Sequence, residues 1–380
     1  MKKLATEVGR ILDNIVESKG LKTTHIAEDI GISHGNFTRL FNAGRQISAD
    51  NVLKMIRAIA PEKEIELMSM YCSEVTMPHN LKIALEYLST NRILDVFEET
   101  LLRCEKNKND ELKEFTSLYR LLFKYINSDI TAHELYKTTR GINVKYEDSI
   151  VMLRFLELYS LYEQKEYHFL LISSENIESQ IDSLLDPYLK ESYKARLCEM
   201  LQYITLKVIN DPIKARTFTD KILNANIGYN FNASSLYIHG ISYLFEDVNK
   251  CLKYLEDCKE IYLSNNKRND LEVVSLTIEF IKVLWNQPVD SFLDTEHKAY
   301  SMIKNGQTEQ GLSILDDLDK KSTPDAFRLF IRGEGTDDQQ YYFESMKLFL
   351  KRGDRYFATL PKVRLLALGV PEYIIDAVFH

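Results

Sequence analysis

Apolar residues recur every three or four positions along most of the chain, which is the spacing of one face of an α-helix. The segments LLFKYI, VMLRFLELYSLY, SSLYIHGISYLF and YYFESMKLFL show this spacing. We find no convincing alternation of apolar and polar residues, the pattern of a half-buried β-strand. The 380-residue chain contains only 14 glycines and 8 prolines, so few positions interrupt helices. The pattern therefore predicts an all-α protein.

The periodic segments are short at the N-terminal end and longer after it. Four short segments predict helices over residues 4–18, 24–30, 33–41 and 49–60. From about residue 82 onward the helices are longer and come in pairs. We expect four parts along the chain: a small helical domain at 1–70, a linker at 71–81, a helical array at 82–369 and a terminal helix at 370–380.

The helix pairs carry a weak internal repeat. PIKARTFTDKIL, NKCLKYLEDCKEI and EQGLSILDDL each place a small residue in a similar frame, and Ala215 and Cys251 stand 36 positions apart. A period near 34 is that of tetratricopeptide-type (TPR) hairpins, in which small residues let adjacent helices approach closely. We predict a right-handed superhelix of degenerate TPR-like hairpins. The concave wall of such an array suits an extended peptide or a partner helix.

The stretch TTHIAEDIGISHGNFTRLFN, residues 23–42, has the spacing of a helix-turn-helix. Ala27 stands at its fifth position, where two helices cross and a larger side chain would separate them. Gly31 stands at the ninth position, where a positive φ ends the first helix. We therefore predict that residues 1–70 are a helix-turn-helix DNA-binding domain. The structural alternative is an ordinary helical hairpin with an alanine and a glycine at these places.

The outward face of the second predicted helix is polar and partly cationic. Arg39 suits guanine and Asn42 suits adenine in the major groove, whereas Lys22 and Arg45 are placed to meet phosphates. The candidate DNA-binding residues are Lys22, Thr23, Thr24, Ser33, His34, Asn36, Thr38, Arg39, Asn42 and Arg45. One such module makes few contacts, so specific binding to double-stranded DNA is expected to use a dimer.

The charge distribution agrees with a DNA contact at the N-terminal end alone. Residues 1–60 carry nine Lys and Arg against six Asp and Glu, a balance of +3, so the rest of the chain accounts for −11 within the total of −8. The five cysteines include no C-x-x-C pair, which favours a reducing, cytoplasmic setting. The most apolar tract, Leu276–Trp285, is too short to span a membrane, which takes about 20 apolar residues.

Catalytic and metal-binding motifs are absent from the sequence. No phosphate-binding loop, metalloprotease motif or nucleophile elbow occurs, and the eight histidines are scattered. Cys251 and Cys258 are interpreted as packing residues. Asp316, Asp317 and Asp319 are interpreted as a solvated run and not as a metal site. We expect neither enzymatic activity nor a cofactor or metal ion.

The C-terminal segment VRLLALGVPEYIIDAVFH is apolar where an isolated helical array should end in a polar cap. Its apolar stripe consists of Val370, Ile374, Ile375, Val378 and Phe379. Such a stripe needs a partner surface. We expect it to form a homodimer interface, with a folded-back capping helix as the alternative.

A helix-turn-helix joined to degenerate TPR-like repeats resembles the peptide-sensing regulators of Gram-positive bacteria and their phages. Within that group the chain is most similar to the arbitrium receptors, the AimR proteins of SPbeta-like Bacillus phages. The resemblance rests on EIELMSMYC, ALEYLSTNRI, SMIKNGQTEQGLSILDDLDK and LKRGDRYFATLPKVRLLALG. It implies a homodimer that binds operator DNA and activates a gene favouring lysis. A short peptide, a hexapeptide in this family, then releases the receptor from DNA and favours lysogeny.

The resemblance also implies a peptide site. The family's acidic residue for a basic peptide side chain corresponds to Asp354, and an aromatic residue corresponds to Tyr356. Ile204 and Ile241 stand where the family has asparagines. The candidate peptide-binding residues are Gln202, Thr205, Asn226, Asn230, Leu244, Phe280, Thr323, Asp354 and Tyr356.

Other interpretations remain open. Asn226 and Asn230 belong to an asparagine cluster that suits either a peptide main chain or ordinary turns. Asp354 could instead cap a helix or pair with a neighbouring arginine, and Tyr356 and Phe280 could be core residues. The alternative functions are a peptide-regulated protein-binding scaffold or inhibitor of a response regulator, and an operator-binding repressor without a ligand.

Overall fold

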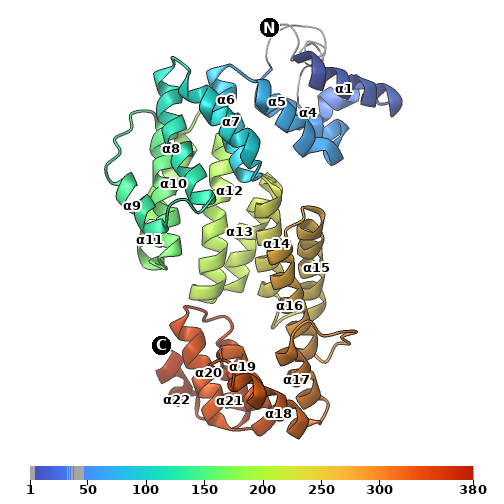
Figure 1. Cartoon of the computed structure of the whole chain (residues 1–380), viewed down its shortest axis with the longest axis vertical. Helices are drawn as coiled ribbons and strands as arrows, with labels where there is room; N and C mark the ends of the chain where they lie inside the picture. Colours follow the sequence, from blue (N-terminus) through green and yellow to red (C-terminus); the bar gives the residue numbers. More distant parts are fainter. Residues whose placement is uncertain (1–4, 32, 34, 36, 38–46, 380) are drawn as a thin grey trace. The chain divides into compact units, whose positions relative to one another are not determined.

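Figure 1 shows the computed structural model of the chain, which describes residues 5–31, 33, 35, 37 and 47–379. All regular elements within these ranges are helices, so the predicted all-α class is confirmed. The chain forms two compact units, an N-terminal unit of residues 1–197 and a C-terminal unit of residues 198–380. The helix α12 (Pro187–Tyr203) contributes residues to both units.

The described helices of the N-terminal unit are short at first and longer afterwards. They are α1 (Ala5–Ser18), α2 (Thr23–Asp29), α4 (Ala49–Ile59), the 3-10 helix η1 (Pro61–Lys63), α5 (Glu64–Glu74), α6 (Pro78–Thr90), α7 (Leu94–Glu105), α8 (Asp110–Ile126), α9 (Ala132–Thr139), α10 (Glu147–Glu163) and α11 (Tyr167–Ser183). The bounds of α1, α2 and α4 differ by at most one residue from the periodicity-based prediction. The segment predicted as a helix over 33–41 lies mostly outside the described residues.

The first helices pack as their apolar spacing requires. Val8, Leu12 and Val16 recur every four residues on α1 and are buried. Ala27 on α2 is only 1% exposed, and Gly31 follows that helix with φ of 69°. These two observations agree with the mechanical reasons for an alanine and a glycine at these positions.

Most of the stretch 71–81, predicted as a linker, is helical. Its first residues complete α5, whose Cys72 is fully buried, and its last residues begin α6. The guanidinium of Arg103 on α7 donates to the carbonyl oxygens of Cys72 at 2.5 Å and Val75 at 3.0 Å. The burial of Cys72 and the hydrogen bonds from Arg103 hold this segment in place. They explain why only three residues connect α5 to α6 where a longer linker was predicted.

A buried ion pair joins helices far apart in sequence within the N-terminal unit. Arg196 on α12 donates to both carboxylate oxygens of Glu86 on α6, at 2.8 Å and 3.0 Å. Tyr119 on α8 donates to the same carboxylate at 2.5 Å, and Ser192 also donates to it. Glu86 is fully buried and Arg196 is 3% exposed. Because every charge is met, this network ties α6, α8 and α12 together.

The described helices of the C-terminal unit follow α12. They are the π-helix η2 (Ile204–Ile209), α13 (Pro212–Ala225), α14 (Tyr229–Ser242), α15 (Val248–Ser264), α16 (Arg268–Leu284), α17 (Thr295–Lys304), α18 (Thr308–Asp319), α19 (Ala326–Thr336), α20 (Gln339–Lys351), α21 (Thr359–Ala367) and α22 (Glu372–Phe379). Successive helices pack against one another, as in α14 with α15 and α17 with α18. This is the pairing expected of TPR-like hairpins.

The small residues of the repeat lie at close helix contacts. Ala215 and Cys251 are fully buried, and Gly311 is buried as well. A Cβ atom on Gly311 would lie 2.6 Å from Cγ1 of Ile303 and 2.8 Å from the carbonyl oxygen of Ala299. Larger side chains would therefore push α17 and α18 apart.

The cysteine and aspartate side chains of this unit have structural roles. Burial raises the pKa of the Cys251 and Cys258 thiols to about 12, which agrees with packing. The aspartates of α18 are not simply a solvated run, since Asp316 and Asp319 form ion pairs with Arg332 of α19 at 2.9 Å and 2.5 Å. Within the described residues no group of three or more His, Cys, Asp or Glu could hold a metal ion.

The predicted C-terminal stripe is divided between core and surface. Val370 is 8% exposed and Ile375 is fully buried, so these residues fold back onto the core of the C-terminal unit. Ile374 and Val378 remain 40% and 41% exposed. The side chain of Phe379 lies outside the described residues. The helix therefore caps its own unit with one face and offers apolar surface with the other.

Candidate functional site

Two of the predicted peptide-binding residues, Gln202 and Thr205, lie at the junction of α12 and η2. The π-helix ends at Asn210, which has a left-handed φ of 65°. The wider π turn leaves the carbonyl oxygen of Lys207 to accept backbone N–H groups from Arg355 at 2.7 Å and Tyr356 at 3.4 Å. Elements distant in sequence are thereby joined: η2 and the segment that follows α20.

Lys207 and Asp354 form a buried ion pair in this junction. Nζ of Lys207 lies 3.0 Å from Oδ2 of Asp354, and it stands 3.7 Å from the ring centroid of Phe357. The Lys207 side chain is 7% exposed and that of Asp354 is 21% exposed. Burial lowers the pKa of Lys207, and the Asp354 carboxylate opposes this shift. The ammonium thus depends on Asp354 and the aromatic ring for its stabilisation.

Asp354 also stabilises the turn before α21. Its Oδ1 accepts the backbone N–H of Phe357 at 3.0 Å. The N-cap of α21 is Ala358, so Asp354 holds the preceding turn and is not the helix N-cap, and its ion pair is made with Lys207. Both carboxylate oxygens of Asp354 already have a partner within the chain.

Tyr356 connects the same segment to α14. Its hydroxyl donates to the carbonyl oxygen of Ile241 at 2.7 Å, and the residue is 2% exposed. Its ring packs 5.2 Å from that of Phe245, centroid to centroid. Burial raises the pKa of Tyr356, so the hydroxyl stays protonated and keeps donating. Leu244, another predicted contact, is fully buried beside this hydrogen bond.

A group of polar side chains, here termed the α12–α14 polar cluster, contains buried atoms without partners. Its members are Gln202, Asn226, Asn232, Ser234 and Ser235. Nε2 of Gln202 donates to Oγ of Ser234 at 3.4 Å, and Nδ2 of Asn232 donates to Oδ1 of Asn226 at 2.6 Å. Among the described residues, Oε1 of Gln202, Oδ1 of Asn232 and Oγ of Ser235 find no hydrogen-bond partner.

Unpaired polar atoms of this kind are uncommon inside proteins. Gln202 and Ser235 are both fully buried. Leaving such an atom without a hydrogen bond costs about 1–3 kcal/mol, so native structures generally supply water or a ligand. The α12–α14 polar cluster offers both an amide oxygen that accepts and a hydroxyl that donates, which are the complements of a peptide main chain.

The other predicted peptide contacts lie in different surroundings. Thr205 is buried in η2, Asn230 is half-buried in the first turn of α14, and Thr323 is exposed in the loop between α18 and α19. Phe280 is 5% exposed and packs edge-on against Phe327, 4.9 Å between centroids. For Phe280, core packing agrees with the structure.

Two residues that the sequence reasoning did not propose complete the junction. Lys207 supplies the cation, and the signal for it was a single lysine within the apolar run ITLKVI. Ser235 supplies an unpaired hydroxyl, and nothing in its sequence context distinguishes it from other serines. The placement of Lys207 depends on the π turn, and Ser235 lies beside Ser234 of α14, which accepts from Gln202 of α12.

Only part of the predicted DNA-binding surface is described. Lys22 and Thr24 are exposed at the start of α2, and Thr23 is partly exposed. Ser33 is exposed, and its carbonyl oxygen accepts the N–H of Phe37 at 2.9 Å. The remaining candidates lie outside the described residues: His34, Asn36, Thr38, Arg39, Asn42 and Arg45.

None of the described helices is long and apolar enough to cross a membrane.

Comparisons with known sequences and with solved structures both find similarity to AimR proteins. A family model described as AimR transcriptional regulator-like matches residues 64–367. The AimR transcriptional regulator of Bacillus phage phi3T is 22% identical over 345 residues, covering 86% of this chain and 88% of the relative. A structure of SeMet-phAimR has a TM-score of 0.84 at 19% identity, covering 98% of this chain and 100% of the other. A structure of phAimR with a ligand gives 0.63 at 20% identity, covering 85% and 98%.

Proposed function

The chain belongs to the AimR transcriptional regulator-like family, and on that premise we propose that it is a peptide-responsive, DNA-binding transcriptional regulator of the phage lysis–lysogeny decision. A homodimer binds double-stranded operator DNA and activates transcription. A short peptide, a hexapeptide as the resemblance implies, then binds the C-terminal unit and releases the protein from DNA. Binding must therefore favour the arrangement that does not hold DNA.

The α12–α14 polar cluster is the observation that carries the peptide proposal. Its buried, unpaired amide and hydroxyl oxygens are suited to the N–H and C=O groups of an extended main chain. The ligand named in the phAimR structure supports a ligand site in this fold. The Asp354 carboxylate already forms an ion pair with Lys207. A basic peptide side chain that binds this carboxylate must therefore share it with Lys207 or displace the lysine ammonium.

The proposed DNA contact rests on the N-terminal module. Its helix-turn-helix spacing comes with a buried Ala27 and a positive φ at Gly31, and residues 1–60 carry a balance of +3. The matching family region begins at residue 64, after the helix-turn-helix stretch of residues 23–42, so the features of that stretch support DNA binding independently. Phosphate contacts by such a module make binding salt-dependent.

Exposed apolar side chains support dimerisation through the C-terminal helices. Ile374 and Val378 on α22, with Val363 and Leu366 on α21, are each more than a third exposed. The two helices contact one another within the unit. Apolar side chains gathered on neighbouring helices favour a partner surface.

The test measures binding of the full chain to fluorescent DNA from upstream of its own gene, with and without the hexapeptide encoded by the adjacent short reading frame. We expect salt-sensitive binding that the peptide abolishes. Gln202→Leu removes an unpaired acceptor and should weaken the peptide response about tenfold while DNA affinity stays unchanged. Gln287→Leu, at an exposed position, is the matched control and should respond normally.

Each part of the proposal can fail separately. A normal peptide response in Gln202→Leu would remove the α12–α14 polar cluster from the peptide site. Arg39→Ala should weaken DNA binding roughly tenfold or more, and unchanged binding would reject the assigned reading face. Capture of a protein partner with no DNA binding at any salt concentration would favour the scaffold or inhibitor alternative.

A further inference from the structure

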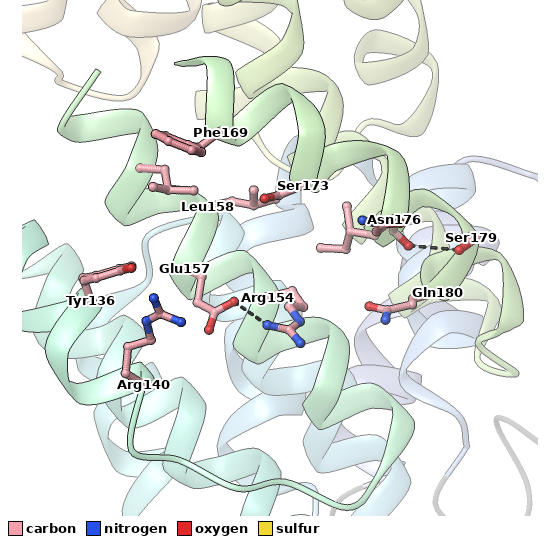
Figure 2. A pocket seen from close by; sticks show the side chains of 12 residues that line it. Tyr136, Arg140, Arg154, Glu157, Leu158, Phe169, Ser173, Asn176, Ser179 and Gln180 are labelled. Carbon is pink, nitrogen blue, oxygen red and sulfur yellow. Dashed lines mark hydrogen bonds and ion pairs between the residues drawn. The ribbon is translucent and has the colours of Figure 1, made fainter. Parts of the chain in front are cut away.

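The N-terminal unit contains a pocket that none of the sites above uses. It lies among α9, α10 and α11 and has a volume of about 760 Å³ (Figure 2). That volume is within the range of sites that hold small ligands, roughly 300–1,000 Å³. All of its lining residues belong to the N-terminal unit.

Two helix faces form the walls of this pocket. From α10 come Arg154, Glu157, Leu158 and Leu161, and from α11 come Phe169, Ser173, Asn176, Ile177 and Gln180. Both sets follow the three- and four-residue spacing of one helical face. Seven residues of helix span about 10 Å at roughly 1.5 Å per residue. About three residues of extended peptide, at roughly 3.3 Å each, cover that length.

Of the two arginines that line the pocket, one has a carboxylate partner and the other has none among the described residues. Arg154 is paired with Glu157, with 2.7 Å between Nη1 and Oε2. Arg140, at the C-cap of α9, lies over the ring of Tyr136 at 5.1 Å and makes no ion pair within the described part of the chain. The lining residues thus carry two positive charges and one negative charge. A ligand with a single negative charge would balance them.

The opposite side of the pocket offers hydrogen-bonding groups. Figure 2 shows Tyr136 and Arg140 on one side and Asn176 and Gln180 on the other. Oε1 of Gln180 is shielded from solvent and has no hydrogen-bond partner among the described residues. It can accept an N–H, while the amide of Asn176 provides both a donor and an acceptor.

Apolar side chains lie between these two polar sides. Leu158 and Ile177 are each 2% exposed, and Phe169 is 58% exposed. Figure 2 shows the Leu158 and Phe169 side chains lining the pocket. The pocket therefore combines a free cation, an apolar surface and a buried amide acceptor.

We propose that this pocket binds the C-terminal end of an extended peptide of about three residues. The terminal carboxylate pairs with Arg140, an apolar side chain packs on Leu158 and Phe169, and a main-chain N–H reaches Oε1 of Gln180. A fatty acid would satisfy the charge and the apolar surface but not the amide acceptor. This site lies in the other unit from the α12–α14 polar cluster, so the inference does not depend on the proposed function.

The test compares two probes on the full chain by calorimetric titration: acetyl-Ala-Leu-Phe with a free carboxylate, and the same tripeptide with a C-terminal amide. We expect the free acid to bind about tenfold more tightly than the amide, because a charge-assisted hydrogen bond is lost in the amide. No saturable binding of the free acid, or equal binding of both probes, would overturn the proposal.

Three variants locate the contacts. Arg140→Gln should weaken binding of the free acid about tenfold and leave the amide unchanged. Lys137→Gln is the matched control, because Lys137 is exposed on the same helix but does not line the pocket, and both probes should bind normally. Gln180→Leu should weaken both probes several-fold. If Arg140→Gln keeps the preference for the free acid, the carboxylate is bound elsewhere and the proposal fails.

Discussion

Replacing Asp354 by asparagine is expected to destabilise the C-terminal unit measurably. The change keeps an oxygen that can accept the N–H of Phe357, so it removes the charge while preserving this hydrogen bond in the turn before α21. It leaves the Lys207 ammonium buried without its partner at 3.0 Å. Breaking a buried pair in this way costs about 3–5 kcal/mol. Because Asp354 is 21% exposed, water screens the charge and about 2–3 kcal/mol is expected.

Thermal unfolding of the full chain, followed by circular dichroism, measures this effect. For a unit of this size about 2–3 kcal/mol lowers Tm by roughly 5–10 °C. The matched control is Asp338→Asn, because Asp338 is an exposed cap whose Oδ1 accepts the N–H of Gln340 at 2.9 Å. Asparagine caps helices about as well as aspartate, so this control should leave Tm nearly unchanged.

The pH dependence gives an independent check with a definite sign. Burial lowers the pKa of Lys207 in the folded chain below the ordinary value of 10.5. The unfolded chain therefore binds more protons between these two pKa values, and stability rises with pH in that window. Losing Asp354 removes the opposing carboxylate and should widen the window. The deficit of Asp354→Asn should thus shrink as pH rises toward 10.5 and persist at neutral pH.

A second substitution decides whether the ion pair is responsible. Lys207→Met removes the buried charge, so the double variant Lys207→Met with Asp354→Asn should recover most of the Tm lost in Asp354→Asn. If Asp354→Asn melts like the wild type, or if the double variant is no more stable than Asp354→Asn, the buried-pair reasoning is wrong. If the double variant recovers its Tm, it also provides a stable protein in which the peptide response can be tested without the Asp354 carboxylate.

Three further outcomes are expected. Arg196→Met should destabilise the N-terminal unit by about 3–5 kcal/mol, because Glu86 is left as an unpaired buried charge, and chemical denaturation measures it. Gly311→Ala should cost about 1–3 kcal/mol through overpacking, whereas Gly141→Ala, whose added Cβ would lie 3.8 Å from its nearest neighbour, should be close to neutral. Ile374→Asp should shift sedimentation toward the monomer and keep the melting curve, and a normal dimer would reject the proposed interface.

The sequence alone was sufficient for features that depend on local spacing. The three- and four-residue apolar period predicted helices throughout, because burying one face of a helix requires that period. Small residues at equivalent positions of the weak repeat predicted close contacts between helices. Gly311 lies at such a contact, between α17 and α18. Asp354 was identified from a resemblance, and its hydrogen bond to Phe357 holds the turn that precedes α21.

The tertiary structure decided which side chains meet. Glu86 and Arg196 are 110 residues apart, and Lys207 and Asp354 are 147 apart, so no local pattern links them. The π turn at η2 rotates the following side chains relative to an α-helix, and this turn brings Lys207 into the core beside Asp354. Whether the amide oxygen of Gln202 is satisfied likewise depends on what α14 places opposite it. Apolar spacing is a property of each helix, whereas charge pairing and hydrogen-bond satisfaction are properties of the packed helices together.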